Sequence, residues 1–308
     1  MPAKFIIGID LGGTNLKAAL LDLECKVFFK KVISTREFHQ KENLIRAIVK
    51  TVNSCIEENG LRKADCLGIG LGLPGPIDVE RGMVHFFPNI PGWKDVRLKG
   101  MLEKKLGMRV VLDNDANLMA LAEFKLGAAK GLRNCVCVTL GTGVGGGIII
   151  DGRLYRGSSF AAGEVGHIPI NEKGPACNCG GKACLESYIG NDKILSSARR
   201  SFGKSMTLEI LSALANAGNK KAKGIWLAAA RRLGICLSGV INILNPDCIV
   251  IGGGVANAGK VLFDEVRAQV RQRAMPVQAH TVKIIKAMLG DDAGLIGAGL
   301  LAKENLLK

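Results

Sequence analysis

The chain has 308 residues, which is long for a single hydrophobic core, so we expect two lobes. With 48% hydrophobic and 22% charged residues, its composition is that of an ordinary soluble globular protein. The net charge of +15 favours anionic ligands in general, including nucleotides and nucleic acid, but does not choose among them.

The first half of the chain predicts strands followed by alternating helices and strands. Continuous apolar runs typical of strands buried on both faces open the chain, and apolar residues at helical spacing begin at Asn43 and end at Gly60. The predicted strands are residues 5–10, 16–21, 25–34, 66–71 and 109–112. The later predicted helices are residues 97–106 and about 116–124.

The second half begins with a similar pattern. A strand over 134–140, the turn G-T-G-V-G-G-G and a returning strand over 148–150 match the opening strand, L-G-G-T-N turn and strand of the first half. This similarity predicts an internal duplication with one copy in each lobe. Three later elements complete the prediction: a long helix over 222–244, a buried strand over 247–251 and a last helix over 294–303.

Residues 141–146 match the dinucleotide-binding pattern G-x-G-x-x-G. That pattern is informative only when a helix follows the turn, and here a strand follows, so a Rossmann interpretation fails. Glycine turns still present backbone N–H groups to an anion without a Cβ in the way. Two such hairpins, one in each lobe, predict a site that holds a phosphate chain between them.

Two aspartates follow buried strands near these turns. Asp10 precedes the first glycine turn and is placed to hold Mg²⁺, while a simple turn-forming role is the alternative. Asp115 stands where a strand ends and a helix begins, so it is either a helix N-cap or a functional carboxylate. Phosphoryl transfer to a hydroxyl requires a base of this kind.

Residues 163–186 form a polar loop with one histidine and three cysteines between two carboxylates. His167, Cys177, Cys179 and Cys184 are four ligands of the type that zinc prefers, in a sequence with too few apolar residues to hold its own shape. Because protein atoms would fill all four positions, we expect a structural zinc. A second cysteine pair, Cys135 and Cys137, lies among apolar residues and predicts only a buried strand face.

The remaining cysteines favour a reduced cytosolic protein over a secreted disulfide scaffold. Most stand singly inside apolar runs, as do Cys55, Cys66, Cys236 and Cys248. The N-terminus shows no secretory leader, and we expect no apolar stretch long enough to cross a bilayer.

Seven motifs occur in order along nearly the whole chain, and together they resemble the ROK family of repressors, open reading frames and sugar kinases. They are D-L-G-G-T, L-P-G, D-N-D-A-N, L-G-T-G-V-G-G-G, G-E-V-G-H, C-N-C-G-G-K-A-C-L-E and I-G-G-G-V-A. Within the family the pattern is most similar to bacterial ATP-dependent glucokinases.

The resemblance implies an α/β, two-lobe, actin-like (ribonuclease-H-like) fold with an interlobe active-site cleft and a zinc-binding loop. We expect a small N-terminal lobe of residues 1–115, joined by the C-terminal helix at about 294–308, and a large lobe of residues 116–293. The implied reaction transfers the γ-phosphoryl of ATP, with Mg²⁺, to a sugar hydroxyl.

The family's functional residues carry over onto matching positions of this sequence. Asp115 would be the general base on the 6-hydroxyl of the sugar. The implied sugar contacts are Asn114, Glu164, His167, Glu186 and, in P-N-I-P-G-W, Asn89. The implied phosphate contacts are Gly12, Gly13, Thr14, Gly141, Thr142 and Gly143, with Gly253 and Gly254 near the adenosine.

The chain departs from the family pattern at Ala183, which replaces the glycine before the last cysteine of C-G-x-x-G-C. Alanine does not adopt positive φ cheaply, so a different turn is one expectation.

Several alternatives stay open at this point. Kinases for N-acetylmannosamine, N-acetylglucosamine, fructose or allose share the same skeleton, and ADP or polyphosphate could replace ATP as the donor. A DNA-binding ROK repressor is disfavoured because only nine residues precede Asp10, too few for a helix-turn-helix domain. The resemblance also implies a homodimer, and we expect a cytoplasmic protein that binds neither nucleic acid nor membrane.

Overall fold

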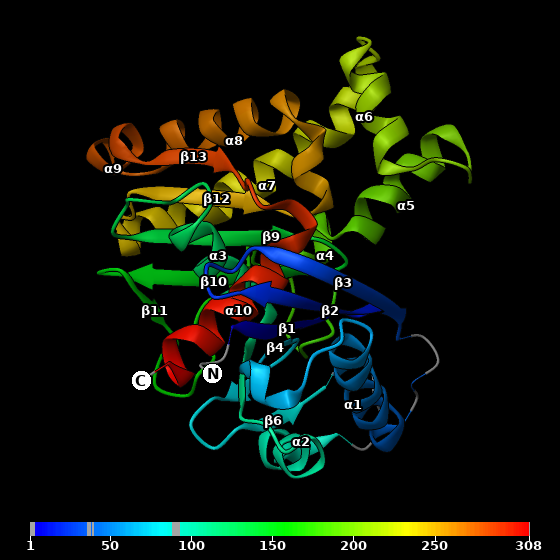
Figure 1. The fold of residues 1–308 in the computed structure, drawn as a ribbon. Helices are drawn as coiled ribbons and strands as arrows, with labels where there is room; N and C mark the ends of the chain where they lie inside the picture. Colours follow the sequence, from blue (N-terminus) through cyan, green and yellow to red (C-terminus); the bar gives the residue numbers. More distant parts are fainter. Residues whose placement is uncertain (1–3, 36–37, 39, 88–92, 308) are drawn as a thin grey trace. The chain divides into compact units, whose positions relative to one another are not determined.

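The computed structural model describes residues 4–35, 38, 40–87 and 93–307, which divide into two compact units (Figure 1). The first unit combines Met1–Ala122, Leu154–Ala162 and Asp291–Lys308, and the second combines Glu123–Arg153 with Gly163–Gly290. The first unit therefore contains residues 1–115 and the C-terminal helix. It also takes in residues 116–122 and 154–162.

A five-stranded sheet with the order β3-β2-β1-β4-β8 forms the centre of the first unit. The strands β1, β2 and β3 pair antiparallel, whereas β4 and β8 run parallel to β1. Their bounds are β1 Phe5–Leu11, β2 Asn15–Asp22, β3 Val27–Ser34, β4 Cys66–Leu73 and β8 Val110–Asn114. All five strands had been predicted from the apolar runs, with ends that differ by no more than two residues.

Helices cover both faces of this first sheet (Figure 1). The helices α1 (Lys41–Glu57) and α2 (Leu98–Leu106) share one core with Ile7 and Ile9 of β1. Helix α10 (Ala293–Leu306) packs on the other side with Ile6, because successive side chains of a strand point to opposite faces. A small sheet that the sequence did not predict consists of β5 (Ile77–Asp78), β6 (Met83–Phe86) and β7 (Lys94–Val96).

The second unit repeats the strand order of the first unit, as β11-β10-β9-β12-β13. The first pair is again an antiparallel hairpin, and β12 and β13 again run parallel to its first strand, β9. This agreement supports the duplication inferred from the two strand–glycine–strand patterns. The strand bounds are β9 Cys135–Leu140, β10 Val144–Ile150, β11 Arg153–Tyr155, β12 Cys248–Gly252 and β13 Lys283–Lys286.

One strand boundary in the second unit was predicted wrongly. The glycine turn is shorter than expected, because β10 already begins at Val144 and includes Gly145, Gly146 and Gly147. Gly146 lies where backbone approaches backbone, since a Cβ there would clash with the carbonyl of Gly163. The run therefore belongs to the strand for packing reasons rather than to the turn.

The second sheet is covered on one face by α7 and α8, whose apolar side chains share a core with β9 and β12. The sulfurs of Cys135 and Cys137 are fully buried, as expected for a structural strand face. The helices that follow the strands are α3 Asp115–Lys125, α4 Glu186–Ile189, α5 Asn191–Phe202, α6 Leu208–Asn216, α7 Lys220–Leu244, α8 Lys260–Arg273 and α9 Pro276–Thr281. Helix α3 begins in the first unit and ends in the second.

Helix α7 corrects the expectation that no stretch could span a bilayer. Its 25 residues are long and apolar enough by length and composition alone. Half of its most apolar window is buried, however, and Trp226, Leu233 and Leu237 are fully enclosed by the core of the second unit. Its apolar face is thus used in packing against protein.

Candidate functional site

In the first unit, three neighbouring parallel strands end at the same edge of the sheet. Asp10 on β1 pairs with Gly72 on β4, and Gly72 pairs with Asp113 on β8. The register places Asp10 at the same sheet edge as Asn114 and Asp115, which directly follow Asp113. Ligands of open α/β sheets bind at this edge, the carboxyl ends of the strands.

The predicted phosphate turn follows Asp10 directly. The N–H of Gly12 donates to the carbonyl of Asn15 at 2.9 Å and closes the turn, while Gly13 and Thr14 are exposed. Consecutive exposed backbone amides at a tight turn provide donors for an anion. The first glycine turn therefore has the form that the sequence predicts for a phosphate contact.

The carboxylate of Asp10 is packed against the start of α10. A Cβ on Gly294 would lie 2.6 Å from Cγ of Asp10, so only glycine fits at that position. Burial raises the pKa of Asp10, and the nearby Lys17 partly opposes this effect. A carboxylate in this position gains from a cation, and one carboxylate together with phosphate oxygens and water is an ordinary Mg²⁺ ligand set.

Asn114 and Asp115 form the start of α3. The side-chain oxygen of Asn114 accepts from the N–H groups of Ala116 at 2.9 Å and Asn117 at 3.3 Å, so Asn114 caps the helix. Oδ1 of Asp115 accepts from the N–H of Ala116 at 2.8 Å. The capping role, which sequence left open for Asp115, falls mainly to Asn114.

The sequence interpretation missed a buried ion pair beside these residues. Asp113 is 1% exposed, and its Oδ2 accepts from Nε and Nη2 of Arg156 at 2.8 and 2.6 Å. A carboxylate directly after the apolar run 110–112 was a signal that Asp113 needs a partner. Arg156 could not be identified as that partner, since 43 residues separate the two.

In the second unit, Glu186 lies against the second glycine turn. Its Oε2 accepts from the N–H of Val144 at 2.8 Å, and a Cβ on Gly143 would lie 2.5 Å from the same oxygen. The N–H of Asn191 donates to the carbonyl of Gly141 at 2.9 Å. The start of α4 and the start of α5 thus line this turn, with Thr142 exposed.

Two further glycines lie beside the same turn. Gly253 has a φ of +82°, and a Cβ there would lie 2.7 Å from the carbonyl carbon of Leu140, the residue before Gly141. Gly254 lies near the side-chain amide of Asn191. The structure therefore brings together Gly141–Gly143 and Gly253–Gly254, which the sequence assigned to one nucleotide.

The four predicted metal ligands converge. The ligand atoms of His167, Cys177, Cys179 and Cys184 lie within 4.8 Å of one another. Cys177 Sγ is 3.6 Å from Nδ1 of His167, and the sulfurs of Cys179 and Cys184 are 3.8 Å apart. In a zinc tetrahedron with bonds of about 2.3 Å to sulfur and about 2.0 Å to nitrogen, sulfur and nitrogen are about 3.5 Å apart and two sulfurs are about 3.8 Å apart. Both measured distances match these values.

Two thiols of this cluster have shifted pKa values. Burial alone would raise the pKa of Cys177, but hydrogen bonds from the backbone N–H of Cys179, from Ser187, from the Cys179 thiol and from His167 lower it to about 7. Burial, followed by the Cys179 and Cys177 thiols, raises the pKa of Cys184 to about 12. A divalent ion would favour the thiolate form of both cysteines, and three thiols with one imidazole are a donor set that fits zinc.

His167 turns its other ring nitrogen away from the cysteines. Nε2 lies 3.8 Å from Oε2 of Glu164. The backbone between them is held against β10, because a Cβ on Gly166 would lie 2.9 Å from Cβ of Val144. Val144 is also the residue whose N–H binds Glu186, so the structure places Glu164, His167 and Glu186 around the start of one strand.

Two sequence predictions have separate outcomes. Asn89 lies outside the described residues. Ala183 adopts a φ of +57°, so the turn keeps the left-handed conformation that the family's glycine would take, contrary to the expectation of a different turn.

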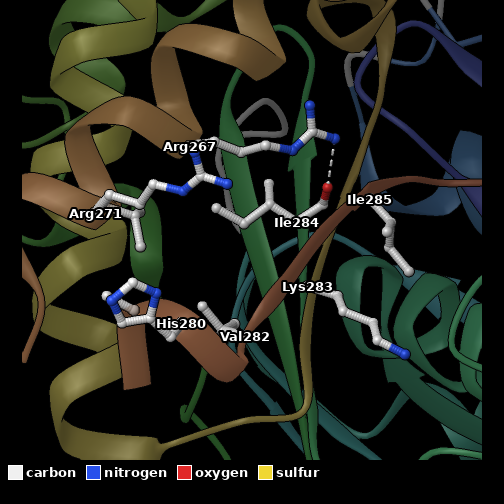
Figure 2. Close-up of a pocket in the computed structure, with 9 residues that line it drawn as sticks. Arg267, Arg271, His280, Val282, Lys283, Ile284 and Ile285 are labelled. Carbon is white, nitrogen blue, oxygen red and sulfur yellow. Dashed lines mark hydrogen bonds between the residues drawn. The ribbon is translucent and has the colours of Figure 1, made fainter. Parts of the chain in front are cut away.

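A separate cavity of about 310 Å³ lies between α8, α9 and β13, away from every predicted residue (Figure 2). Arg267, Arg271, His280 and Lys283 surround it. The guanidinium of Arg267 has a structural role there, since Nη2 donates to the carbonyl of Ile284 at 2.8 Å. The cavity contains none of the carboxylates or glycine turns described above.

Two α/β units with the same strand order, each built on a glycine-turn hairpin, define the actin-like (ribonuclease-H-like) class. A Cys/His cluster inserted in the second unit is consistent with the sugar-kinase branch of that class. The chain belongs to the ROK family, whose model matches residues 6–305.

Proteins similar over the full length include a glucokinase from Thermotoga maritima, 34% identical with 99% of both chains covered. A glucokinase from Halalkalibacterium halodurans is 35% identical over 99% of this chain and 96% of its own length. Among solved structures, a ROK family glucokinase from Streptomyces griseus in complex with glucose and AMPPNP has a TM-score of 0.85 and 31% identity. That comparison covers 98% of this chain and all of the other chain.

Another functional class occurs among the relatives. A xylose repressor from Caldicellulosiruptor bescii is 29% identical over 98% of this chain, but only 79% of the repressor is matched. Similarity alone therefore fixes the family and not the activity, which has to be argued from the residues.

Proposed function

We propose that this protein is an ATP-dependent glucokinase that transfers the γ-phosphoryl group to the 6-hydroxyl of glucose. The observation that carries the proposal is the common sheet edge in the first unit, where Asp10, the first glycine turn and Asp115 are neighbours. A phosphate turn beside a carboxylate base is the combination that phosphoryl transfer to an alcohol requires. Full-length similarity to two glucokinases supports the same activity.

In the first unit, Asp115 acts as the general base that accepts the proton of the sugar hydroxyl. Gly12, Gly13 and Thr14 donate hydrogen bonds to phosphate oxygens. Asp10 holds Mg²⁺ directly or through water, and the ion, when bound, neutralises charge that develops on the phosphates. Asn114 contacts a sugar hydroxyl, with Asn89 as a further contact.

In the second unit, Glu164, His167 and Glu186 bind sugar hydroxyls. Gly141, Thr142 and Gly143 hold phosphate, and Gly253 and Gly254 lie near the adenosine. Zinc on His167, Cys177, Cys179 and Cys184 is structural, because these protein atoms complete a tetrahedron. Nδ1 of His167 faces Cys177 and would bind the ion, which leaves Nε2 beside Glu164.

We also propose that the enzyme is a cytoplasmic homodimer that binds neither nucleic acid nor membrane. The cysteines support a reducing compartment, since none of the ten is paired in a disulfide and all except Cys179 are buried. Dimerisation rests on analogy with the family.

A panel of hexoses with ATP, read as ADP release, tests the substrate. We expect glucose to have the highest kcat/KM among glucose, fructose, allose, N-acetylglucosamine and N-acetylmannosamine. A kcat/KM more than about ten-fold higher for an N-acetyl sugar would overturn the glucokinase proposal. The transition state for that sugar would then be bound better than the one for glucose by about 1.4 kcal/mol. Replacing ATP with ADP or polyphosphate, with the hexose phosphate as the readout, tests the donor.

A further inference from the structure

Asp113 is enclosed at the end of β8 and makes four hydrogen bonds. Oδ2 accepts from Nε and Nη2 of Arg156, as described above, at 2.8 and 2.6 Å. Oδ1 accepts from the backbone N–H of Asn114 at 2.8 Å and from Nδ2 of Asn117 at 2.9 Å. The Asp113 side chain is 2% exposed, so this is not a solvent-screened surface pair.

These bonds hold the backbone on both sides of Asp115. Asn114 is fixed at its N–H by Asp113, and Asn117 is fixed at its side chain, which is 2% exposed, by the same carboxylate. Asp115 lies between them on the first turn of α3. Asp113 therefore holds the backbone from which the Asp115 side chain projects.

Arg156 fixes a second stretch of chain. Its guanidinium binds Asp113, and its carbonyl accepts from the N–H of Ala162 at 2.9 Å, which closes the segment 156–162 into a loop. The next two residues are Gly163 and Glu164, so the closed loop ends directly before the Gly-Glu-Val-Gly-His sequence. Arg156 thus makes two contacts in the first unit: its side chain binds Asp113, and its backbone carbonyl binds Ala162, the residue before Gly163.

We infer that the Arg156 side chain is a positioning group for phosphoryl transfer. Through Asp113 it holds the backbone that carries Asp115, and the same ion pair fixes the start of the loop 156–162, which leads to Glu164. This inference rests on the proposed function, which assigns the roles of Asp115 and Glu164. The planar guanidinium is needed because Nε and Nη2 bind one oxygen together, a geometry that an ammonium group does not reproduce.

The alternative is that the pair only stabilises the fold, since breaking a buried pair leaves an uncompensated charge. Four proteins distinguish the two roles: wild type, Arg156→Gln, Asp113→Asn and the double variant Arg156→Gln/Asp113→Asn. For each, kcat, the glucose KM and the midpoint of urea unfolding are measured, with kinetics at a temperature where circular dichroism shows the protein folded. Arg133→Gln, which breaks the exposed pair with Asp151, is the control.

A positioning role predicts that activity and stability separate. Arg156→Gln lowers kcat by about 10-fold to 100-fold and raises the glucose KM several-fold. The double variant, which no longer buries a lone charge, regains much of the lost stability but not the lost kcat. Arg156→Lys keeps the charge and stays at least about five-fold below wild type in kcat, and Arg133→Gln behaves as wild type.

Three results would overturn the inference. A folded Arg156→Gln protein with kcat within two-fold of wild type would remove Arg156 from any positioning role. Recovery of kcat together with stability in the double variant would mean that the pair is only structural. Wild-type protein that phosphorylates no hexose would overturn the proposed function and this inference together. The first two results, by contrast, would overturn the inference alone, because the wild type would still be an active kinase.

Discussion

The carboxylate of Glu186 binds the backbone N–H of Val144 at 2.8 Å, at the point where the second glycine turn becomes strand β10. The same oxygen would lie 2.5 Å from a Cβ on Gly143. A proposed sugar contact and a proposed phosphate turn therefore share one hydrogen bond in the second unit. This contact explains why Gly143 has to be glycine.

Glu186→Gln tests that relationship. We expect the glucose KM to rise by about 10-fold to 100-fold, because a hydrogen bond to a charged group contributes about 1.5–3 kcal/mol. The measurement is steady-state kinetics at saturating ATP. Glu172→Gln, an exposed carboxylate of the same loop, serves as the control and should leave KM unchanged. An unaltered glucose KM in Glu186→Gln would remove this residue from the sugar site.

Asp115→Asn removes the proposed base while keeping the size of the side chain. We expect kcat to fall by about 10²–10⁴, the usual contribution of general base catalysis, with glucose binding largely retained. Stopped-flow turnover and calorimetric binding measure the two quantities separately. Asp151→Asn is a matched control, because this exposed aspartate has a φ of +51°, which asparagine tolerates. Near-normal turnover of Asp115→Asn would exclude it as the base.

Metal analysis tests the cysteine cluster. Purified protein should contain about one zinc per chain, and Cys179→Ser should reduce that content, because a hydroxyl replaces one thiolate ligand. Cys66→Ala is the control, because this buried cysteine stands outside the cluster of four ligands. Metal-free protein with full activity would show that the cluster is only a thiol-rich turn.

Much of the fold followed from sequence because its signals are local. The strands of the first sheet are continuous apolar runs, and α7 shows its apolar stripe over 25 residues. The loop of residues 163–186 was identified as a ligand cluster because its cysteines are close in sequence and lie in polar surroundings. The short strands β5 to β7, of two to four residues, carry too few residues to show a period.

The contacts that sequence could not predict join residues far apart in the chain. Asp113 and Arg156 are 43 residues apart, and Glu123 and Leu289 are 166 apart. Neither pair forms a sequence motif, because each contact depends on which elements pack together in the fold and not on local spacing. The start of β10 was misplaced for a related reason: the glycines allow close backbone approach to Gly163, which a turn interpretation does not reveal.

Glu123 is completely buried and binds only backbone donors. Its two carboxylate oxygens accept from the N–H groups of Ala128, Met288 and Leu289 at 2.8 to 3.1 Å. Glu123→Gln should lower the free energy of unfolding by about 2–4 kcal/mol, because an amide has one acceptor and turns N–H donors toward N–H groups. Urea unfolding measures the loss, and a change within error would contradict this structural role.

Ala183→Gly tests whether the left-handed alanine is a strained substitution for glycine. Relief of positive φ would stabilise the fold by about 1–2 kcal/mol. Against this, glycine loses a methyl that is 1% exposed, worth about 0.8 kcal/mol, and gains unfolded-state entropy worth about 0.4–1 kcal/mol. The terms nearly cancel, so we expect urea unfolding of the zinc-loaded protein to change by less than about 1 kcal/mol. If the variant is more stable by more than that, the backbone strain at a φ of +57° exceeds the stabilisation that the buried methyl contributes.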